Sequence, residues 1–142
     1  LLSHQEVIVV VGLTKRQIKN LPSGIIGIEK TENVHRLADL YSMADVLINP
    51  TYQDTLPTVN MESLACGTPV VAYDTGGCKD IVDRDTGYIV ERGDLNSMLV
   101  SITRIRHKGK SHYEAACRQR AVDCFDRAER YLDYLKLYDR LL

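Results

Sequence analysis

The stretch that decides the fold reads DTLPTVNMESLACGTPVV and spans residues 54–71. It predicts a helix over Pro57–Cys66, because proline suits the first helical position and the glycine that follows ends a helix. A run of apolar and β-branched residues comes next and predicts a buried strand over Val70–Tyr73. A helix that leads straight into such a strand is the repeating unit of an α/β fold.

The same alternation extends to both sides of this stretch. Apolar runs predict further strands, and helical spacing predicts further helices. The strands are Val7–Gly12, Gly24–Ile28, Val46–Asn49 and Tyr88–Val90, and the helices are Lys15–Asn20, Val34–Met43, Cys78–Val82 and a helical tail from Leu95 onward. We expect the first strand to be buried on both faces. The predicted fold class is α/β, with a Rossmann-like parallel sheet and flanking helices.

Composition narrows the class of protein. The 142 residues suit one ordinary domain, and the apolar fraction of 44% suits a protein with a buried core. A formal net charge of −1 argues against a nucleic-acid partner. No secretory signal or run long enough to span a bilayer is visible. The four cysteines lack the spacing of a metal or redox motif, so we expect free thiols and a cytoplasmic protein.

Ligands of parallel sheets bind beyond the carboxyl ends of the strands, so the loop at residues 50–56 is the first place to look for chemistry. Asp54 lies just before the predicted helix, and Glu62 lies about a turn and a half inside it. The helix N-terminus favours a phosphate, and a carboxylate can bind the hydroxyl pair of a ribose. The N–H donors for the phosphate would come from Thr55, Leu56, Thr58 and Val59, because Pro57 has none. Carboxylates repel a diphosphate, however, and these loops offer no clear cation.

The spacing of Asp54 and Glu62 alone is a weak indication of a functional site. Isolated acidic residues are mostly solvated surface groups, and a pair of glycines is most often a turn. The whole stretch, however, resembles the signature of the retaining glycosyltransferases of family four, which have the GT-B fold. That signature has an acidic residue, seven others and a glutamate, followed by a small-residue helix and Gly-x-Pro-Val-Val. Ala44–Pro50, Gly76–Gly77 and 85–94 also match, and the resemblance covers roughly residues 5 to 105.

The resemblance assigns a role to each site residue. It implies that Glu62 holds the donor ribose and that Asp54 contacts the transferred sugar near the reacting centre, as the catalytic candidate. The backbone that lines the sugar and diphosphate would be that of Thr55, Leu56, Thr58 and Val59. Ile28 would flank the base. Asp54 departs from the family, where glutamate is commoner, and its shorter side chain has less reach.

The resemblance also implies the wider function. We expect the C-terminal half of a GT-B fold, truncated at its N-terminus, with residues 1–106 as the nucleotide-sugar-binding part and 107–142 as C-terminal helices of the same domain. The full-length enzyme would be a hexosyltransferase-type, retaining glycosyltransferase of polysaccharide or glycolipid synthesis, with no cofactor and no metal. The acceptor domain and the basic residues that bind diphosphate would precede Leu1, so this fragment alone would be inactive.

Three alternatives stay open at this point. A dinucleotide-dependent oxidoreductase is disfavoured, because Gly12 alone stands where Gly-x-Gly-x-x-Gly is needed. A sugar-nucleotide epimerase needs acid–base residues over the sugar, whereas His4, His35, His107 and His112 lie outside the Asp54 loop. A non-catalytic GT-B subunit would keep the fold without the chemistry.

The C-terminal tail carries basic residues from Arg104 onward, interspersed with acidic ones. Peripheral contact with the inner face of a membrane is one interpretation, and ordinary solvated helix faces are the favoured one, because the charges are mixed. The apolar stripe of the last helix includes Tyr131, Leu135 and Tyr138, and we expect it to be partly exposed.

Overall fold

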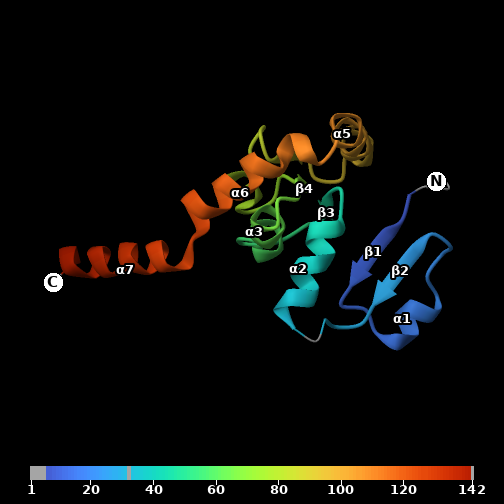
Figure 1. Ribbon diagram of the computed structural model, residues 1–142, viewed down its shortest axis with the longest axis horizontal. Helices are drawn as coiled ribbons and strands as arrows, with labels where there is room; N and C mark the ends of the chain where they lie inside the picture. Colours follow the sequence, from blue (N-terminus) through green and yellow to red (C-terminus); the bar gives the residue numbers. More distant parts are fainter. Residues whose placement is uncertain (1–5, 32, 142) are drawn as a thin grey trace. The chain divides into compact units, whose positions relative to one another are not determined.

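The computed structural model describes residues 6–31 and 33–141 (Figure 1). The chain divides into two compact units, residues 1–39 and 40–142, and each is described here by itself. The elements follow one another as β1 (Ile8–Val11), α1 (Lys15–Lys19), β2 (Ile25–Ile28), α2 (Val34–Met43), β3 (Leu47–Asn49), α3 (Thr58–Ala65), β4 (Val70–Tyr73), α4 (Cys78–Ile81), β5 (Gly87–Val90), α5 (Leu95–Lys108), α6 (Ser111–Phe125) and α7 (Arg127–Leu141).

The first unit is a small parallel β–α–β arrangement. β1 pairs with β2 in parallel, with Ile8 opposite Ile25. The connecting helix α1 begins with a capping box, in which the Thr14 hydroxyl accepts from the Gln17 N–H and the Gln17 side chain accepts from the Thr14 N–H. The expectation that the first strand is buried on both faces is wrong, because Val9 is 46% exposed. A sheet of two strands with one short helix has too little material to cover both faces.

The second unit contains a three-stranded parallel sheet in the order β3-β4-β5. β4 is the central strand, and all four of its residues are buried. Its apolar run meets the requirement of a parallel strand that is covered on both faces. The buried apolar core of the described residues lies entirely in this unit and consists of Leu64, Val70, Val71, Ala72, Tyr73, Cys78, Ile81, Val82, Val90, Met98, Ile105, Tyr113, Cys117 and Ala121.

Helix α3 precedes β4 and ends in a Schellman motif. The Gly67 N–H donates to the Leu64 carbonyl at 2.9 Å, and the Thr68 N–H donates to the Ser63 carbonyl at 2.9 Å. Gly67 has a φ of +73°, which suits glycine. At the other end, Pro57 is the N-cap, with an extended backbone, so the expectation that proline takes the first helical position is wrong by one residue.

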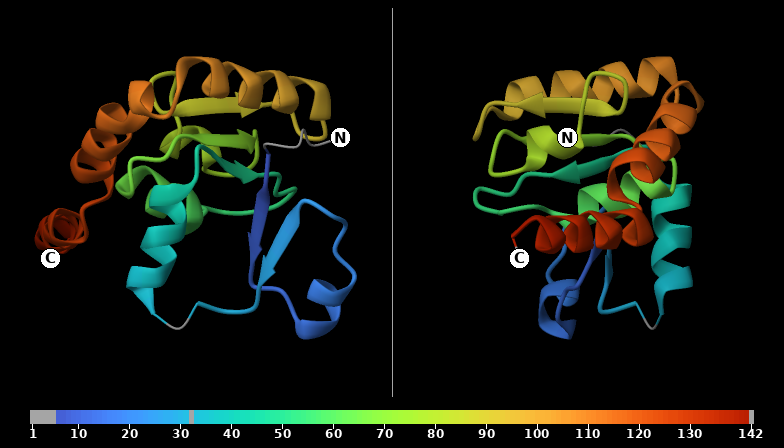
Figure 2. Two further views of the ribbon diagram at one scale, coloured as in Figure 1. Left: turned by 45° about the vertical axis from the view of Figure 1, so that its right-hand side comes forward. Right: turned by 90° about the vertical axis from the view of Figure 1, so that its left-hand side faces the viewer.

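The three C-terminal helices differ in how many of their side chains are buried. In both views of Figure 2, α5 runs beside β5, and its Met98 and Ile105 enter the core. Helix α6 packs against α3 and buries Tyr113 and Cys117. By contrast, none of the residues of α7 is buried, and its predicted stripe of Tyr131, Leu135 and Tyr138 is 59–65% exposed.

Two further sequence expectations concern the chain as a whole. All four cysteines are free thiols, as expected. No helix in the described part of the chain combines the length and apolarity needed to cross a membrane.

Candidate functional site

The loops that follow β3 and β4 lie together at the carboxyl edge of the second sheet. The Thr75 hydroxyl, after β4, donates to the carbonyl of Thr51, after β3, at 3.2 Å. The Tyr52 ring meets the Tyr73 ring edge-on, with 5.5 Å between their centroids. The predicted loop at residues 50–56 and the loop that contains Gly76–Gly77 are therefore in direct contact.

The pair Gly76–Gly77 makes the closest part of this contact. The Gly77 N–H donates to the Thr55 carbonyl at 2.8 Å. A Cβ atom built on Gly76 would lie 1.8 Å from the carbonyl oxygen of Asp54, and the φ of Gly76 is +48°. Only a residue without a side chain fits between the two loops in this conformation. The glycine pair is thus required for the Asp54 loop to keep its place.

The N-terminal end of α3 presents the predicted site residues at the surface. Asp54 and the four predicted backbone contacts are exposed, with Leu56 at 49% and Val59 at 40%; the other two contacts are Thr55 and Thr58. The Leu56 N–H donates to the Asp54 carboxylate at 3.2 Å. This N–H could therefore bind a ligand only if Asp54 released it, so Asp54 and Leu56 are coupled.

Glu62 is also exposed, and it has a partner that sequence reasoning missed. The Tyr41 hydroxyl, from α2, donates to Glu62 Oε2 at 3.0 Å. Burial raises the pKa of Tyr41 well above its ordinary value, and the hydrogen bond to Glu62 and the negative charge of that residue raise it further. Tyr41 is therefore a neutral hydrogen-bond donor throughout the physiological pH range. The sequence placed it only within the predicted helix Val34–Met43.

Buried polar side chains link α3 to β3 and α4. The Asn49 amide, at the end of β3, donates to the Asn60 side chain at 2.9 Å. Asn60 is fully buried, and its own amide contacts the Cys78 sulfur at 3.8 Å. These contacts join β3, α3 and α4 beneath the exposed end of α3. Because a buried amide is costly to leave unpaired, they hold the three elements in one arrangement.

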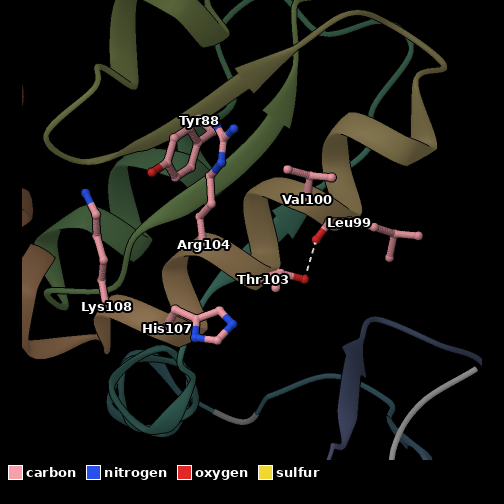
Figure 3. Close-up of a pocket in the computed structure, with 7 residues that line it drawn as sticks. All are labelled: Tyr88, Leu99, Val100, Thr103, Arg104, His107 and Lys108. Carbon is pink, nitrogen blue, oxygen red and sulfur yellow. Dashed lines mark hydrogen bonds between the residues drawn. The ribbon is translucent and has the colours of Figure 1, made fainter.

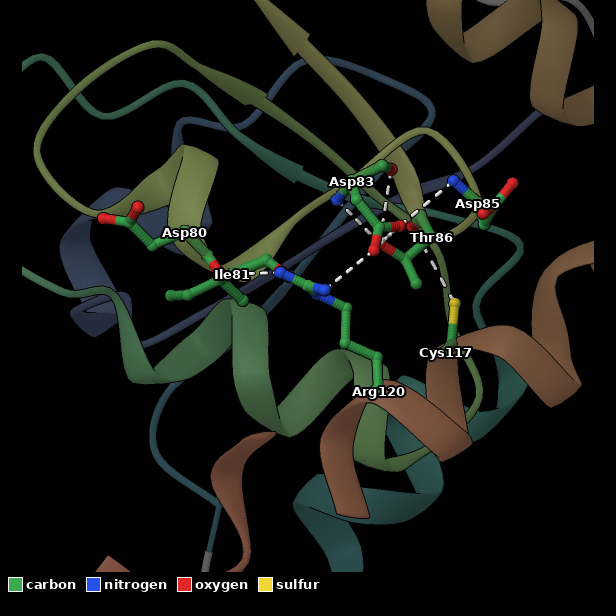
Figure 4. A network of polar contacts seen from close by, with 7 residues as sticks. All are labelled: Asp80, Ile81, Asp83, Asp85, Thr86, Cys117 and Arg120. Carbon is green, nitrogen blue, oxygen red and sulfur yellow. Dashed lines mark hydrogen bonds and ion pairs between the residues drawn. The ribbon is translucent and has the colours of Figure 1, made fainter. Parts of the chain in front are cut away.

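A second polar network joins α6 to the C-terminal end of α4 (Figure 4). Arg120 of α6 donates to the carbonyls of Ile81 at 2.5 Å and Asp80 at 2.7 Å. The same guanidinium pairs with the Asp83 carboxylate at 2.8 Å. The other oxygen of Asp83 accepts from the Thr86 hydroxyl at 2.9 Å. Arg120 thus ties α6 to the end of α4 and to the turn before β5.

Two shallow grooves lie near this sheet. One, of about 460 Å³, is at the carboxyl ends of β4 and β5 and is lined by Asp74, Ile89, Val90, Glu91 and Arg92. The other, of about 470 Å³, is between β5 and α5 (Figure 3) and is lined by Tyr88, Leu99, Val100, Thr103, Arg104, His107 and Lys108. Neither includes Asp54 or Glu62. The side chains of both predicted residues are exposed.

The remaining site predictions fall outside this cluster. Ile28 ends β2 in the first unit, so its contact with the base stays a prediction. His35, His107 and His112 are exposed, and His4 lies outside the described residues. Among residues 6–31 and 33–141, no group of three or more His, Cys, Asp or Glu is placed to hold a metal ion. Metal-independent chemistry likewise stays a prediction.

Comparison with known families matches residues 2–107 to the family described as Glycosyl transferases group 1. The chain belongs to this glycosyltransferase family. The expected membership of the GT-B glycosyltransferases and the expected Rossmann-like α/β fold are confirmed.

Relatives of this glycosyltransferase chain are longer than the chain itself. A D-inositol 3-phosphate glycosyltransferase of Thermomonospora curvata is 34% identical over 107 residues, which are 75% of this chain and 23% of the relative. An alpha-maltose-1-phosphate synthase of Mycolicibacterium smegmatis is 27% identical over 140 residues, which are 89% of this chain and 35% of the relative. The chain thus spans about a quarter to a third of these proteins.

Solved structures agree with the fold. Sucrose-phosphate synthase of Thermosynechococcus elongatus superposes with a TM-score of 0.75 and 29% identity, over 88% of this chain and 32% of that protein. Anabaena HepE, solved in complex with UDP, gives a TM-score of 0.77 and 19% identity, over 97% of this chain and 42% of that protein.

Proposed function

We propose that this chain is the donor-binding part of a retaining glycosyltransferase. The full-length enzyme transfers a sugar from a nucleoside diphosphate sugar to an acceptor hydroxyl. The observation that supports this most directly is the exposed N-terminal end of α3. This end lies next to the Asp54 loop, and the hydrogen bond between Asn49 and the buried Asn60 holds the helix in place beneath it. The N–H groups of its first turn and its partial positive charge suit a diphosphate.

Each of the site residues binds a different part of the donor. Glu62 accepts hydrogen bonds from the ribose hydroxyls, because an ionised carboxylate can take both members of a vicinal diol. The backbone of α3 and its preceding loop receives the diphosphate. Asp54 faces the transferred sugar and releases the Leu56 N–H when it turns toward that ligand. The helix end then stabilises the leaving diphosphate without a metal, together with basic groups of the full-length protein.

The wider setting is part of the same proposal. The acceptor is bound by a further domain of the full-length protein, and this chain alone binds donor weakly and transfers no sugar. We place the enzyme in the cytoplasm, in polysaccharide or glycolipid synthesis, with its mixed-charge helices available for peripheral contact with a membrane.

A thermal-shift screen of the full-length protein against UDP-, GDP- and ADP-sugars tests the donor site. One of these donors should raise the melting temperature, because a ligand that binds only the folded state stabilises it. Glu62→Ala should lose most of this shift, whereas Glu129→Ala, on the exposed helix α7, should keep it. A full shift in Glu62→Ala would contradict the assignment.

The reaction itself separates the proposal from the epimerase and from the non-catalytic subunit. Asp54→Asn keeps the size of the side chain but removes its charge, and we expect kcat to fall by about 100-fold, the scale of losing one transition-state contact. Unchanged activity in Asp54→Asn would point to a non-catalytic subunit. Conversion of the donor without any acceptor would point to an epimerase.

A further inference from the structure

Tyr41 lies where it can control the Glu62 side chain. It sits in the last turn of α2, half-buried, and its hydroxyl donates to Glu62 Oε2 at 3.0 Å. Glu62 projects from α3, which is 21 residues away along the chain. This hydrogen bond therefore joins two helices rather than neighbours on one helix.

The last turn of α2 is itself fixed by contacts from other elements. The Thr68 hydroxyl donates to the Tyr41 carbonyl at 2.6 Å, and the Lys110 ammonium donates to the Ser42 carbonyl. Thr68 is buried, and its own carbonyl accepts from the Ser63 hydroxyl at 3.0 Å. Carbonyls at a helix end lack partners within the helix, so these donors hold the end in place. The Tyr41 ring therefore starts from a fixed backbone.

The hydrogen bond leaves most of the Glu62 carboxylate available. A carboxylate offers about four acceptor positions on two oxygens, and Tyr41 occupies one of them on Oε2. An exposed glutamate that has no partner samples many rotamers, and a ligand must order them at an entropic cost. With Oε2 anchored, Oε1 has a restricted range of directions before any ligand arrives.

We propose that Tyr41 is a positioning residue that presents Glu62 to the ribose hydroxyls of the donor. This inference rests on the proposed function, because it requires Glu62 to bind the ribose. Tyr41 acts only through Glu62 and stays protonated, so it contributes to donor binding and takes no part in the transfer step.

The test uses Tyr41→Phe in the full-length protein, which removes only the hydroxyl. Its control is Tyr131→Phe, on the exposed face of α7. The ligands are UDP, GDP and ADP with their 2′-deoxy counterparts, titrated by calorimetry. For the diphosphate that binds, we expect Tyr41→Phe to raise Kd about five- to tenfold, the scale of one ordinary hydrogen bond. The preference for ribose over 2′-deoxyribose should shrink.

The ribose preference distinguishes positioning from a purely structural role, which would lower the melting temperature and leave that preference intact. The inference alone would be overturned if Tyr41→Phe kept the wild-type Kd and the wild-type ribose preference while Glu62→Ala lost donor affinity and that preference. Wild-type binding in Glu62→Ala would instead overturn the proposed donor site. In the double variant, Tyr41→Phe should add nothing to the effect of Glu62→Ala, because the two act as one unit. Fully additive effects would also overturn the inference.

Discussion

At the scale of single residues, Gly76 shows how tightly the two site loops are matched. A methyl group at this position would overlap the Asp54 carbonyl oxygen, at 1.8 Å, and the φ of +48° adds conformational strain. We expect Gly76→Ala to lower the free energy of unfolding by about 2–4 kcal/mol, which combines strain and displaced backbone. Chemical denaturation followed by circular dichroism measures this change.

Gly109→Ala is the matched control for that prediction. Gly109 has a φ of +79°, but its nearest neighbour to an added Cβ is the Ser111 hydroxyl, at 3.8 Å. It should therefore show the conformational cost alone, about 1–3 kcal/mol, because its ψ of 149° puts the backbone near a region that glycine almost alone adopts. Equal losses in the two variants would mean that the contact between the loops contributes nothing.

The same scale shows where sequence reasoning stops. Asp54 and Glu62 could be singled out because their spacing belongs to a signature that is local in sequence. Tyr41 could not, because its partner lies 21 residues away on another helix. The sequence places Tyr41 on a predicted helix, but where a tyrosine hydroxyl finds its partner depends on tertiary packing.

At the scale of elements, Arg120 joins α6 to α4. It donates to two carbonyls at the end of α4 and pairs with Asp83, and its side chain is 24% exposed. Arg120→Gln leaves these acceptors without full compensation, so we expect a loss of about 1–3 kcal/mol in the free energy of unfolding. Arg130→Gln, which breaks an exposed pair with Asp133 on α7, should change it by less than about 0.5 kcal/mol. Similar losses in both variants, measured by urea denaturation, would contradict this reading.

The start of α5 makes a pH-dependent contribution to stability. Asp94 is its N-cap and accepts from the Ser97 hydroxyl at 2.5 Å and from the Ser97 N–H at 2.9 Å. These hydrogen bonds lower the pKa of Asp94 below its ordinary value of 3.8. A lowered pKa in the folded state means that the stabilisation is present above that ordinary value and is lost as the pH falls through the folded-state pKa.

Melting curves from pH 7 down to pH 2 check this prediction. Asp94→Ala should melt below the wild type at pH 7, because α5 loses its cap, and the gap should narrow as the solution becomes acidic. Lys79–Asp74, an exposed ion pair at 3.9 Å, provides the comparison, because Asp74→Ala should change little at any pH. If the difference in melting temperature stayed constant with pH, the stabilisation by the cap would come from its geometry rather than from the charge of Asp94.

The type and order of the elements could be predicted from sequence, and their arrangement only in part. Predicted strands such as Val46–Asn49 match the observed β3 to within one residue, because apolar runs and glycine or proline breaks are local signals. The division into sheets of two and three strands was not predicted. Pairing partners depend on contacts between distant segments, which periodicity does not report. The exposure of β1 was missed for the same reason.

At the scale of the whole chain, stability should be uneven. The buried apolar core of the described residues runs from Leu64 to Ala121, all in the second unit, whereas α1, α2 and α7 bury none of their residues. A two-stranded sheet is marginal in isolation, and helices gain most of their stability from packing. In hydrogen exchange of the 142-residue chain, we therefore expect amides of β4 to be the slowest. Those of the first unit and of α7 should exchange first, by local opening that leaves the rest of the second unit folded.

Mass spectrometry of peptic fragments resolves these segments. Brief proteolysis should agree with it, because cleavage of a locally opened segment follows the free energy of that opening. The first cuts should fall within residues 6–39 and 127–141, and a fragment of about residues 40–126 should persist. The site loops at residues 50–56 and 74–77 belong to that fragment, so the contact between Gly77 and Thr55 should survive both cuts. Uniform exchange across β1, β4 and α7 would show that the chain opens as one cooperative unit, with the first unit and α7 stabilised as strongly as the core.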